Sequence, residues 1–194
     1  MLKNLVKKNR SYRRFYQNIP VTKKQLRKYI DLARMSASAA NLQPLKYILS
    51  RSKEKNALIF RTLAWAGYIK NWDGPGEGER PSAYIIVLGD TTISKSCQYD
   101  CGIAAQSILL GAVEDGLGGC IIGSIKRQEL REALNIADRY NILIVLALGK
   151  PKEIIKIETA YDTKEIRYWR NNSDVHHVPK RPLEEIIIEP GGDS

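Results

Sequence analysis

The chain has 194 residues, and its 43% hydrophobic and 27% charged residues are typical of a globular protein that buries a core. This length predicts one domain, residues 1–194. The longest uncharged apolar stretch, residues 101–113, is too short to cross a bilayer, and no apolar signal segment follows the basic N-terminus. We therefore expect a cytoplasmic protein that makes no membrane contact.

The positive charge of the chain is unevenly distributed. The formal net charge is +10, and residues 1–30 contain ten Lys and Arg but no acidic residue. Such a segment attracts polyanions, and nucleic acid and a phosphorylated cofactor are both candidates. The odd number of cysteines argues against a disulfide framework, and their spacing from His176 and His177 matches structural zinc sites poorly. We expect no metal site, and we expect the two histidines to be solvated.

The first half of the chain predicts mainly helices. Thr22 has the chemistry of an N-cap, and the apolar residues after it follow helical spacing. Residues 35–41, rich in Ser and Ala, predict a loop, as do residues 71–81 with their three glycines and two prolines. The regular elements expected here are helices at 2–8, 23–35 and 53–70 and a strand at 45–50.

The second half alternates strands and helices without a regular βαβ pattern, which favours the α+β class. Asp100 is a candidate cap for a helix that carries no charge before Glu114, and Gly116 is placed to end it. A helix without a polar face must be buried by the fold or by a partner chain. The elements expected here are helices at about 101–115 and 127–134 and strands at 83–88, 120–123, 141–148 and 184–189.

Two segments near the N-terminus could bind a ligand. The segment NRSYRRF, residues 9–15, places three arginines and a serine close together, which suits phosphate oxygens, although a solvated basic face explains the composition equally well. The segment SASAANLQP, residues 36–44, combines small residues with Asn41 and Gln43, whose amides suit the edge of a heterocycle. Composition alone favours an ordinary loop for this second segment.

Two later segments are less specific. GLGGCIIG, residues 116–123, indicates exposed backbone near a tight connection but is neither a P-loop nor a dinucleotide fingerprint. VPKRP, residues 178–182, is either a phosphate clamp or a charged linker, and the residues alone favour the linker. The chain shows no serine-hydrolase elbow and no evident acid and base pair. This fits an enzyme whose cofactor carries the chemistry.

Taken in order, these segments resemble the nitroreductase family of FMN-dependent oxidoreductases. NRSYRRF is similar to the family's Arg-Arg-Ser-x-Arg-x-Phe, and SASAANLQPLKY to its Ser-x-x-Asn-x-Gln-Pro loop. YDCGIAAQSILLGAVEDGLGGCIIG is similar to its core helix followed by Gly-Leu-Gly-x-Cys-x-x-Gly, and ILIVLALGKPKE to its late strand ending in Leu-Gly-x-Pro. The resemblance covers about residues 3–189. Three positions depart from the family pattern: Asn9, Leu45 and Ile121.

The resemblance implies a central, mainly antiparallel sheet flanked by helices, in an intertwined homodimer that holds FMN at its interface. Residues 98–116 would form much of the dimer core, residues 62–80 a lid over the flavin, and residues 184–189 a strand that reaches the partner subunit. Trp65, Tyr68 and Trp72 in the lid would stack on a nicotinamide or a nitroaromatic ring, or pack in the core.

The flavin contacts implied by the resemblance fall into four groups. The groups are Arg10, Ser11 and Arg13 for the phosphate and ribityl chain, Lys180 and Arg181 for the phosphate, Ile122 and Gly123 beside the isoalloxazine ring, and Ser38, Ala39 and Asn41 from the other subunit.

The implied activity passes hydride from NADH or NADPH through flavin N5 to an electron-poor acceptor, such as a nitroaromatic or a quinone, by a ping-pong mechanism. No side chain is expected to be catalytic, because flavin N5 carries the chemistry. A halogenated ring or free flavin is an alternative acceptor. A basic nucleic-acid-binding module is the alternative from another class, and it is disfavoured because aromatic residues do not interleave with the basic cluster as in a stacking platform.

Overall fold

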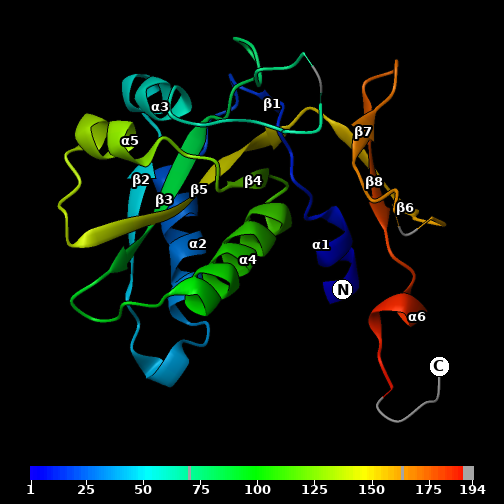
Figure 1. Cartoon of the computed structure of the whole chain (residues 1–194). Helices are drawn as coiled ribbons and strands as arrows, with labels where there is room; N and C mark the ends of the chain where they lie inside the picture. Colours follow the sequence, from blue (N-terminus) through cyan, green and yellow to red (C-terminus); the bar gives the residue numbers. More distant parts are fainter. Residues whose placement is uncertain (70, 163, 190–194) are drawn as a thin grey trace. The chain divides into compact units, whose positions relative to one another are not determined.

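The computed structural model describes residues 1–69, 71–162 and 164–189, which form two compact units (Figure 1). The first unit comprises Met1–Ala66 and Asp73–Lys152, and the second comprises Gly67–Trp72 and the chain from Glu153 onward. One domain over residues 1–194 stays a prediction.

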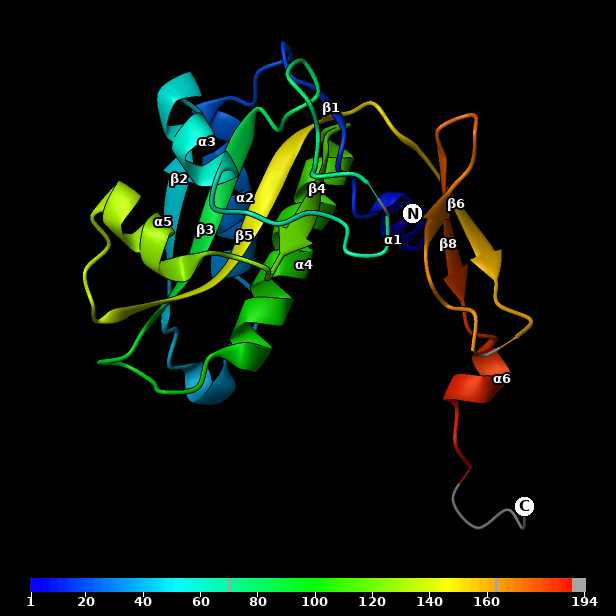
Figure 2. The same cartoon turned by 45° about the horizontal axis from the view of Figure 1, so that its top comes forward.

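A five-stranded antiparallel sheet forms the centre of the first unit (Figure 2). β5 pairs with β3 on one side and with both β1 and β4 on the other, and β2 extends the sheet beyond β3. All eight residues of β3 are buried, and β5 is central, as its apolar sequence predicts. The strands are β1 (Phe15–Tyr16), β2 (Leu45–Ser50), β3 (Ala83–Asp90), β4 (Gly118–Ile122) and β5 (Tyr140–Pro151).

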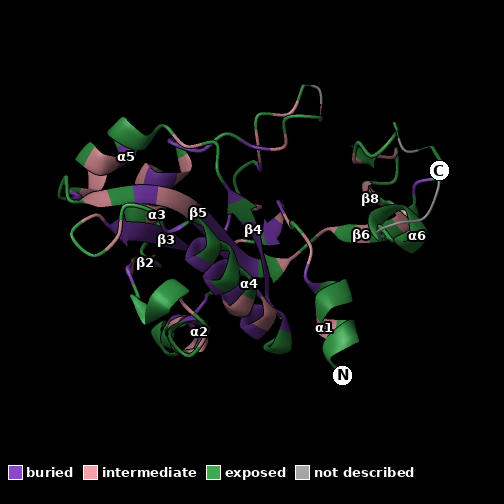
Figure 3. Cartoon of the chain, turned by 60° about the horizontal axis from the view of Figure 1, so that its bottom comes forward, coloured by how far each residue is buried: buried purple, intermediate pink, exposed green. Residues whose placement is uncertain are grey.

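Helices cover both faces of this sheet, with α2 and α4 on one face and α3 and α5 on the other (Figure 3). This arrangement confirms the α+β class and the antiparallel sheet flanked by helices. None of the described helices is long and apolar enough to cross a membrane. The helices are α1 (Leu2–Lys8), α2 (Lys23–Arg34), α3 (Lys53–Phe60), α4 (Gln98–Glu114), α5 (Arg127–Leu134) and the 3-10 helix η1 (Ala39–Asn41).

The start of α2 and its packing on α4 follow from single residues. The Thr22 hydroxyl accepts from the Gln25 backbone N–H, and the Gln25 side chain accepts from the Thr22 N–H, so the predicted cap is a full capping box. On α4, a Cβ at Gly111 would collide with the side chain of Leu32 and lie 3.2 Å from the Tyr29 ring. The absence of a side chain at Gly111 therefore allows the two helices to approach closely.

The helix predicted over residues 53–70 is wrong beyond Phe60, where α3 ends. Thr62 donates its hydroxyl to the Ile59 carbonyl at 2.7 Å. Leu63 then forms a bridge to Ile125 instead of continuing the helix. The pairing buries Leu63, so an apolar residue stands where the buried face of a longer helix would also have one. Residue 70 lies outside the described residues.

One face of α4 is exposed in the chain and carries little charge. Tyr99 is 81% exposed and Ile103 is 40% exposed, and Gly102 and Gln106 lie exposed with them. These positions are three or four residues apart, so they form one strip along the helix. We call Tyr99, Gly102, Ile103 and Gln106 the α4 strip. The remaining faces of α4 pack in the core with α2 and the sheet.

The second unit is built on a small sheet in the order β6-β8-β7, in which β6 and β8 are parallel. Aromatic rings pack on its two histidines: Trp169 stacks on His177 at 4.0 Å between ring centroids, and Tyr168 packs on His176 at 5.2 Å. The prediction that both histidines are solvated is wrong, because strand pairing and these rings bury them to 1% and 7% exposure. The strands are β6 (Ile154–Thr159), β7 (Trp169–Arg170) and β8 (Val175–Lys180).

The strand predicted over residues 184–189 is also wrong at its start, where a single helical turn, α6 (Leu183–Ile186), replaces it. Pro182 precedes this turn, and two glutamates in its first turn suit the positive end of a helix. Arg181 pairs with Glu185 four residues on. A strand needs a hydrogen-bonded neighbour, and none of the described residues supplies one here.

Candidate functional site

The arginine-rich segment and the glycine-rich segment lie side by side in the first unit. Ser11 forms a parallel bridge with Gly119 of β4, and the Tyr12 N–H donates to the Gly119 carbonyl at 3.0 Å. Two segments that are over 100 residues apart in sequence thus form one group, which we call the anion group: residues 9–13 and Gly118–Gly119.

Glycine is required where the two segments meet. A Cβ at Gly118 would lie 2.6 Å from the Tyr12 ring, and a Cβ at Gly119 would lie 2.5 Å from the Ala147 carbonyl oxygen and 2.7 Å from Leu109. Backbone atoms such as the Ala147 oxygen cannot move aside within a paired sheet. The glycines of the GLGGCIIG segment therefore allow close packing as well as exposed backbone.

The cations of the anion group are held by backbone carbonyls. Arg13 is 9% exposed and donates from Nη1 to the Ser11 carbonyl at 3.2 Å. Arg10 donates from Nη2 to the Val6 carbonyl at 2.9 Å, while Ser11 is exposed. Guanidinium groups and a hydroxyl are donor types that suit phosphate oxygens.

Asn9, which departs from the family pattern, has a structural role. Its side chain is 8% exposed and donates from Nδ2 to Gln106 Oε1 at 3.1 Å. The bond ties the anion group to the middle of α4. An arginine here would have to bury its charge against α4 or turn away from it.

The backbone of the loop over residues 36–44 is strained, and a side chain of α4 holds the loop in place. Ala40, Asn41 and Gln43 have φ values of 48°, 54° and 51°, in the left-handed region that residues with a side chain rarely adopt. The Ser38 hydroxyl donates to the Asp100 carboxylate and accepts from the Gln43 N–H at 2.9 Å. We call residues 38–43 the amide loop.

Asp100 holds the amide loop in place, and the sequence does not reveal this contact. The prediction that it caps α4 is wrong: the helix begins earlier, with Cys97 at the N-cap, and Asp100 lies in its first turn. It is buried, and besides the Ser38 hydroxyl it accepts from the Ala39 N–H at 3.3 Å. The Ser38 hydroxyl is thereby occupied within its own chain, which leaves backbone groups and Asn41 to face a ligand.

The amide loop and the anion group contact α4 at different levels. The amide loop contacts Asp100, in the first turn, whereas Asn9 contacts Gln106, about 9 Å further along the axis at 1.5 Å per residue. Ser11 lies further on, beside the strand that follows the C-terminal end of the helix. The α4 strip, from Tyr99 to Gln106, runs along the same stretch of the helix.

The predicted ring-contact residues lie at an edge of the sheet. β4 pairs with β5 on one side, and Ile122 is buried while Gly123 is exposed. A Cβ at Gly123 would have no atom within 4 Å, so space is open there. Ile121, in place of the family's tryptophan, is 45% exposed. A flat ring has room beside this edge.

Both ends of the predicted lid are fixed near these residues. At one end, the Ala64 N–H donates to the Ser124 carbonyl at 3.0 Å, directly after Gly123. At the other end, the Phe15 N–H donates to the Glu79 carbonyl at 2.9 Å, directly after the anion group. The segment over residues 62–80 therefore spans from the ring-contact residues to the anion group.

The three lid aromatics are divided between the two units. Trp65 is 7% exposed and packs in the first unit against Gly74 and Phe60, with 5.8 Å between its ring and the Phe60 ring. Tyr68 and Trp72 belong to the second unit. There, Tyr68 packs on Tyr168 and Trp72 lies under Arg170. For Trp65, core packing is the role observed.

An ion cluster that the sequence does not reveal closes the loop beside Phe15. Arg14 donates from Nε and Nη2 to the two Glu79 carboxylate oxygens at 2.6 and 2.7 Å, and Lys152 adds a third bond at 2.8 Å. The Arg14 hydrogen bonds, with help from Lys152, lower the pKa of Glu79 from 4.5 to about 2. The cluster fixes the far end of the predicted lid.

Lys180 and Arg181 lie in the second unit, where Lys180 ends β8 and Arg181 pairs with Glu185. Their role at a flavin phosphate stays a prediction.

Burial raises the pKa of the Cys97 thiol and raises that of the Cys101 thiol to about 11. Both thiols therefore stay protonated at neutral pH and are poor nucleophiles.

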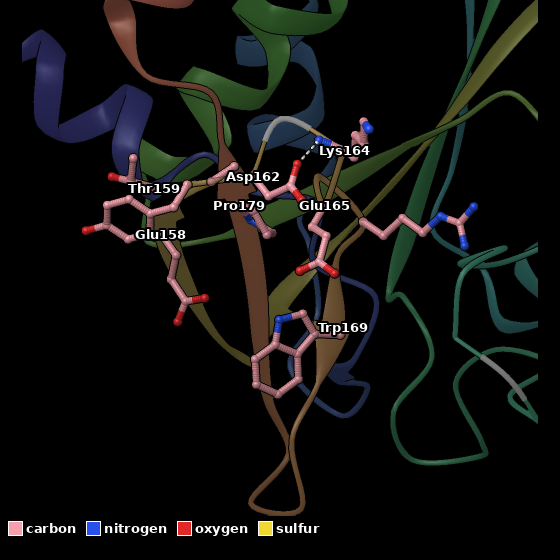
Figure 4. A pocket seen from close by; sticks show the side chains of 10 residues that line it. Glu158, Thr159, Asp162, Lys164, Glu165, Trp169 and Pro179 are labelled. Carbon is pink, nitrogen blue, oxygen red and sulfur yellow. Dashed lines mark hydrogen bonds between the residues drawn. The ribbon is translucent and has the colours of Figure 1, made fainter.

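A cavity of about 650 Å³ in the second unit contains none of the predicted flavin residues (Figure 4). Three carboxylates, Glu158, Asp162 and Glu165, line it beside Trp169. Glu158 also bonds to His177 Nδ1 at 2.5 Å. These three carboxylates outnumber the two cations of the lining, Lys164 and Arg167, so the cavity does not favour a flavin phosphate.

Comparison with known families decides the identity of the chain. A family model described as the nitroreductase family matches residues 6–75 and 80–150. The chain belongs to the nitroreductase family. It is therefore an oxidoreductase, and the resemblance that the sequence motifs indicate is confirmed.

Curated relatives and solved structures agree with this membership. A relative from Archaeoglobus fulgidus with the provisional name NADH dehydrogenase/NAD(P)H nitroreductase is 28% identical over 72% of this chain and 80% of its own. A nitroreductase family structure from Clostridium novyi is 25% identical, with a TM-score of 0.66, over 78% of this chain and 87% of that chain. A structure from Clostridium difficile, described as an FMN-dependent nitroreductase, is 24% identical, with a TM-score of 0.66, over 85% of this chain and 94% of that chain.

Proposed function

We propose that this nitroreductase-family chain forms a homodimer that holds FMN between its subunits and uses NADH or NADPH to reduce an electron-poor acceptor such as a nitroaromatic or a quinone. One observation carries the proposal: the anion group and the amide loop contact α4 at different levels, and the exposed α4 strip runs along the same stretch of the helix. The exposed Tyr99 and Ile103 of this strip favour a second chain packed on it, and a ligand at such an interface could take the two groups from different subunits.

A twofold dimer brings such groups together. In a twofold interface the same patch meets itself, so if the α4 strip packs on its copy with the helices antiparallel, the first turn of one helix faces the far end of the other. The amide loop of one subunit then approaches the anion group of its partner. Tyr99 and Ile103 would be covered by the same contact.

The residues present fit FMN. The guanidinium groups of Arg10 and Arg13 and the Ser11 hydroxyl are phosphate donors, and the open space beside Gly123 suits a flat ring. Asn41 offers amide donors and acceptors to a heterocycle edge. The names of the A. fulgidus and C. difficile proteins support the nicotinamide donor and the flavin.

The chain's own residues would bind and orient the reactants. When bound, FMN supplies the chemistry by accepting electrons from the nicotinamide and returning them to the acceptor. Arg10 and Arg13 would hold the phosphate, and the amide loop, preformed by Asp100, would meet the ring without further ordering. The segment over residues 62–80 would limit the access of water.

The purified chain tests this function. We expect a yellow protein that releases FMN on heating and oxidises NADH or NADPH when menadione or nitrofurazone is added. A colourless protein that does not bind added FMN, and that binds DNA with an affinity falling steeply with salt, would instead support the nucleic-acid-binding alternative. If the protein is yellow but inactive with both compounds, the acceptor proposed here is wrong while the cofactor holds.

A further inference from the structure

A second cavity in the first unit, of about 510 Å³, lies between α3, the start of β3 and the segment that follows β1. None of the residues implied to bind FMN lines it. Its lining combines charged, polar and apolar side chains, which is the usual composition of a small-molecule site.

Three buried hydrogen-bond donors without a partner belong to residues that line this cavity. The Tyr84 hydroxyl, Ser82 Oγ and Arg80 Nε are buried, and none has a hydrogen-bond partner in the part of the chain that the structure describes. Tyr84 is only 1% exposed. Buried polar atoms are nearly always paired in native proteins, so three such atoms in one cavity indicate a missing partner.

Two polar side chains of this cavity, Asn56 and Glu77, already have hydrogen-bond or ion-pair partners. Asn56 donates from Nδ2 to the Ser82 carbonyl at 2.9 Å and accepts from Ser50 Oγ at 2.8 Å. Glu77 pairs with Arg80 through Nη1, at 3.1 Å, which leaves Arg80 Nε unused. An arginine nitrogen can only donate, so the missing partner must be an acceptor.

The charge and the apolar walls of the cavity indicate which class of ligand it can bind. Arg51, Lys53 and Arg80 line the cavity against a single carboxylate, that of Glu77. Phe60 and Pro20 contribute apolar walls, and the Arg80 guanidinium lies 4.3 Å from the centre of the Phe60 ring. The cavity thus offers an excess of positive charge at its donors and an apolar wall beside them.

We propose that this cavity binds a small organic carboxylate, with its two oxygens at Arg80 Nε, Ser82 Oγ and the Tyr84 hydroxyl and its apolar body against Phe60. A carboxylate has about four lone-pair positions on two oxygens, which suffice for three donors. Inorganic phosphate would satisfy the donors but leave the apolar wall uncovered. The site uses none of the residues proposed to contact the flavin, and it shares Glu77, Gly78 and Arg80 with the far end of the predicted lid.

The test uses cyclohexanecarboxylate, whose puckered ring stacks poorly on a flat flavin, added to the purified chain with its FMN and measured by calorimetry. We expect saturable binding of one molecule per chain and no change in flavin absorbance. Tyr84→Phe should weaken this binding about tenfold, because a hydrogen bond to a charged group is lost. Tyr29→Phe, which removes a buried hydroxyl that bonds Asp115 away from the cavity, should leave it unchanged.

Two comparisons complete the test. Cyclohexylmethanol, which lacks the charge, should bind much more weakly than the carboxylate, and inorganic phosphate should also bind more weakly. If Tyr84→Phe does not fold, Ser82→Ala takes its place with the same expectation. Absence of carboxylate binding, equal binding by Tyr84→Phe, or tighter binding of phosphate would each overturn the assignment.

Discussion

Arg13 is the most deeply buried cation of the anion group, at 9% exposure, and its position is set by the bridge between Ser11 and Gly119. If it holds the FMN phosphate, Arg13→Ala removes a charge-assisted hydrogen bond worth about 1.5–3 kcal/mol. The dissociation constant for FMN, measured by fluorescence titration, should rise about 10- to 150-fold. Lys23→Ala, an exposed cation in α2, is the matched control, and an unchanged affinity in Arg13→Ala would remove Arg13 from the phosphate site.

Glu79 makes the stability of the fold depend on pH in acid. Its pKa is lowered from 4.5 to about 2, chiefly by the Arg14 hydrogen bonds, so its stabilising effect is fully present above pH 4.5 and is lost as the pH falls through about 2. Glu79→Gln should lower the free energy of unfolding at pH 7 by about 1.5–3 kcal/mol, and this difference should shrink toward pH 2.

Urea denaturation of the wild-type chain and Glu79→Gln at several pH values measures the effect. The control is Asp31→Asn, which breaks the exposed pair with Arg34 and should cost less than about 1 kcal/mol. A Glu79→Gln difference that stays constant from pH 7 to pH 2 would contradict the role of the Glu79 charge.

At the scale of elements, a glycine within β4 and the glycine that directly follows β4 differ in how much space surrounds them. A Cβ at Gly119 would lie 2.5 Å from the Ala147 carbonyl oxygen, whereas a Cβ at Gly123 would meet no atom within 4 Å. Gly119→Ala should therefore lower the free energy of unfolding by about 1–3 kcal/mol, the usual cost of overpacking, while Gly123→Ala should change it little. Thermal unfolding of the two variants decides, and equal midpoints would show that β4 can shift to admit the methyl group.

The elements that the sequence predicts well are those defined by neighbouring residues. Thr22 and Gln25 form their capping box within three residues, so the start of α2 can be predicted from the sequence. The end of α3 cannot, because Leu63 is buried by a bridge to Ile125, and local spacing does not reveal a partner over 60 residues away.

The same distinction between local and distant contacts applies to the candidate site. The residue types of the anion group are visible as a motif, but the role of Asp100 depends on a contact with Ser38 from a distant segment, and that of Glu79 on Arg14 and Lys152. Family resemblance supplies the flavin itself. The helical turn of α6 cannot be predicted in this way, because a row of isoleucines indicates a strand even though no strand among the described residues pairs with it.

At the scale of the whole molecule, the proposed site takes its anion group from one chain and its amide loop from the other. The two parts can therefore be mutated in different chains. In Arg13→Ala both sites of a dimer lack the phosphate contact. In Asn41→Gly, which keeps the positive φ of 54° accessible, both sites lack the amide. A mixed dimer of the two variants has one site with both defects and one site with neither.

Complementation tests the central claim, a shared flavin site, most directly. Arg13→Ala and Asn41→Gly chains carrying different affinity tags are co-expressed, the mixed dimer is isolated through both tags, and tightly bound FMN per dimer is measured by absorbance. The shared site predicts one native-affinity FMN per mixed dimer, although each variant alone binds weakly. A mixed dimer with only weak sites, or a protein that binds FMN tightly as a monomer, would contradict the account.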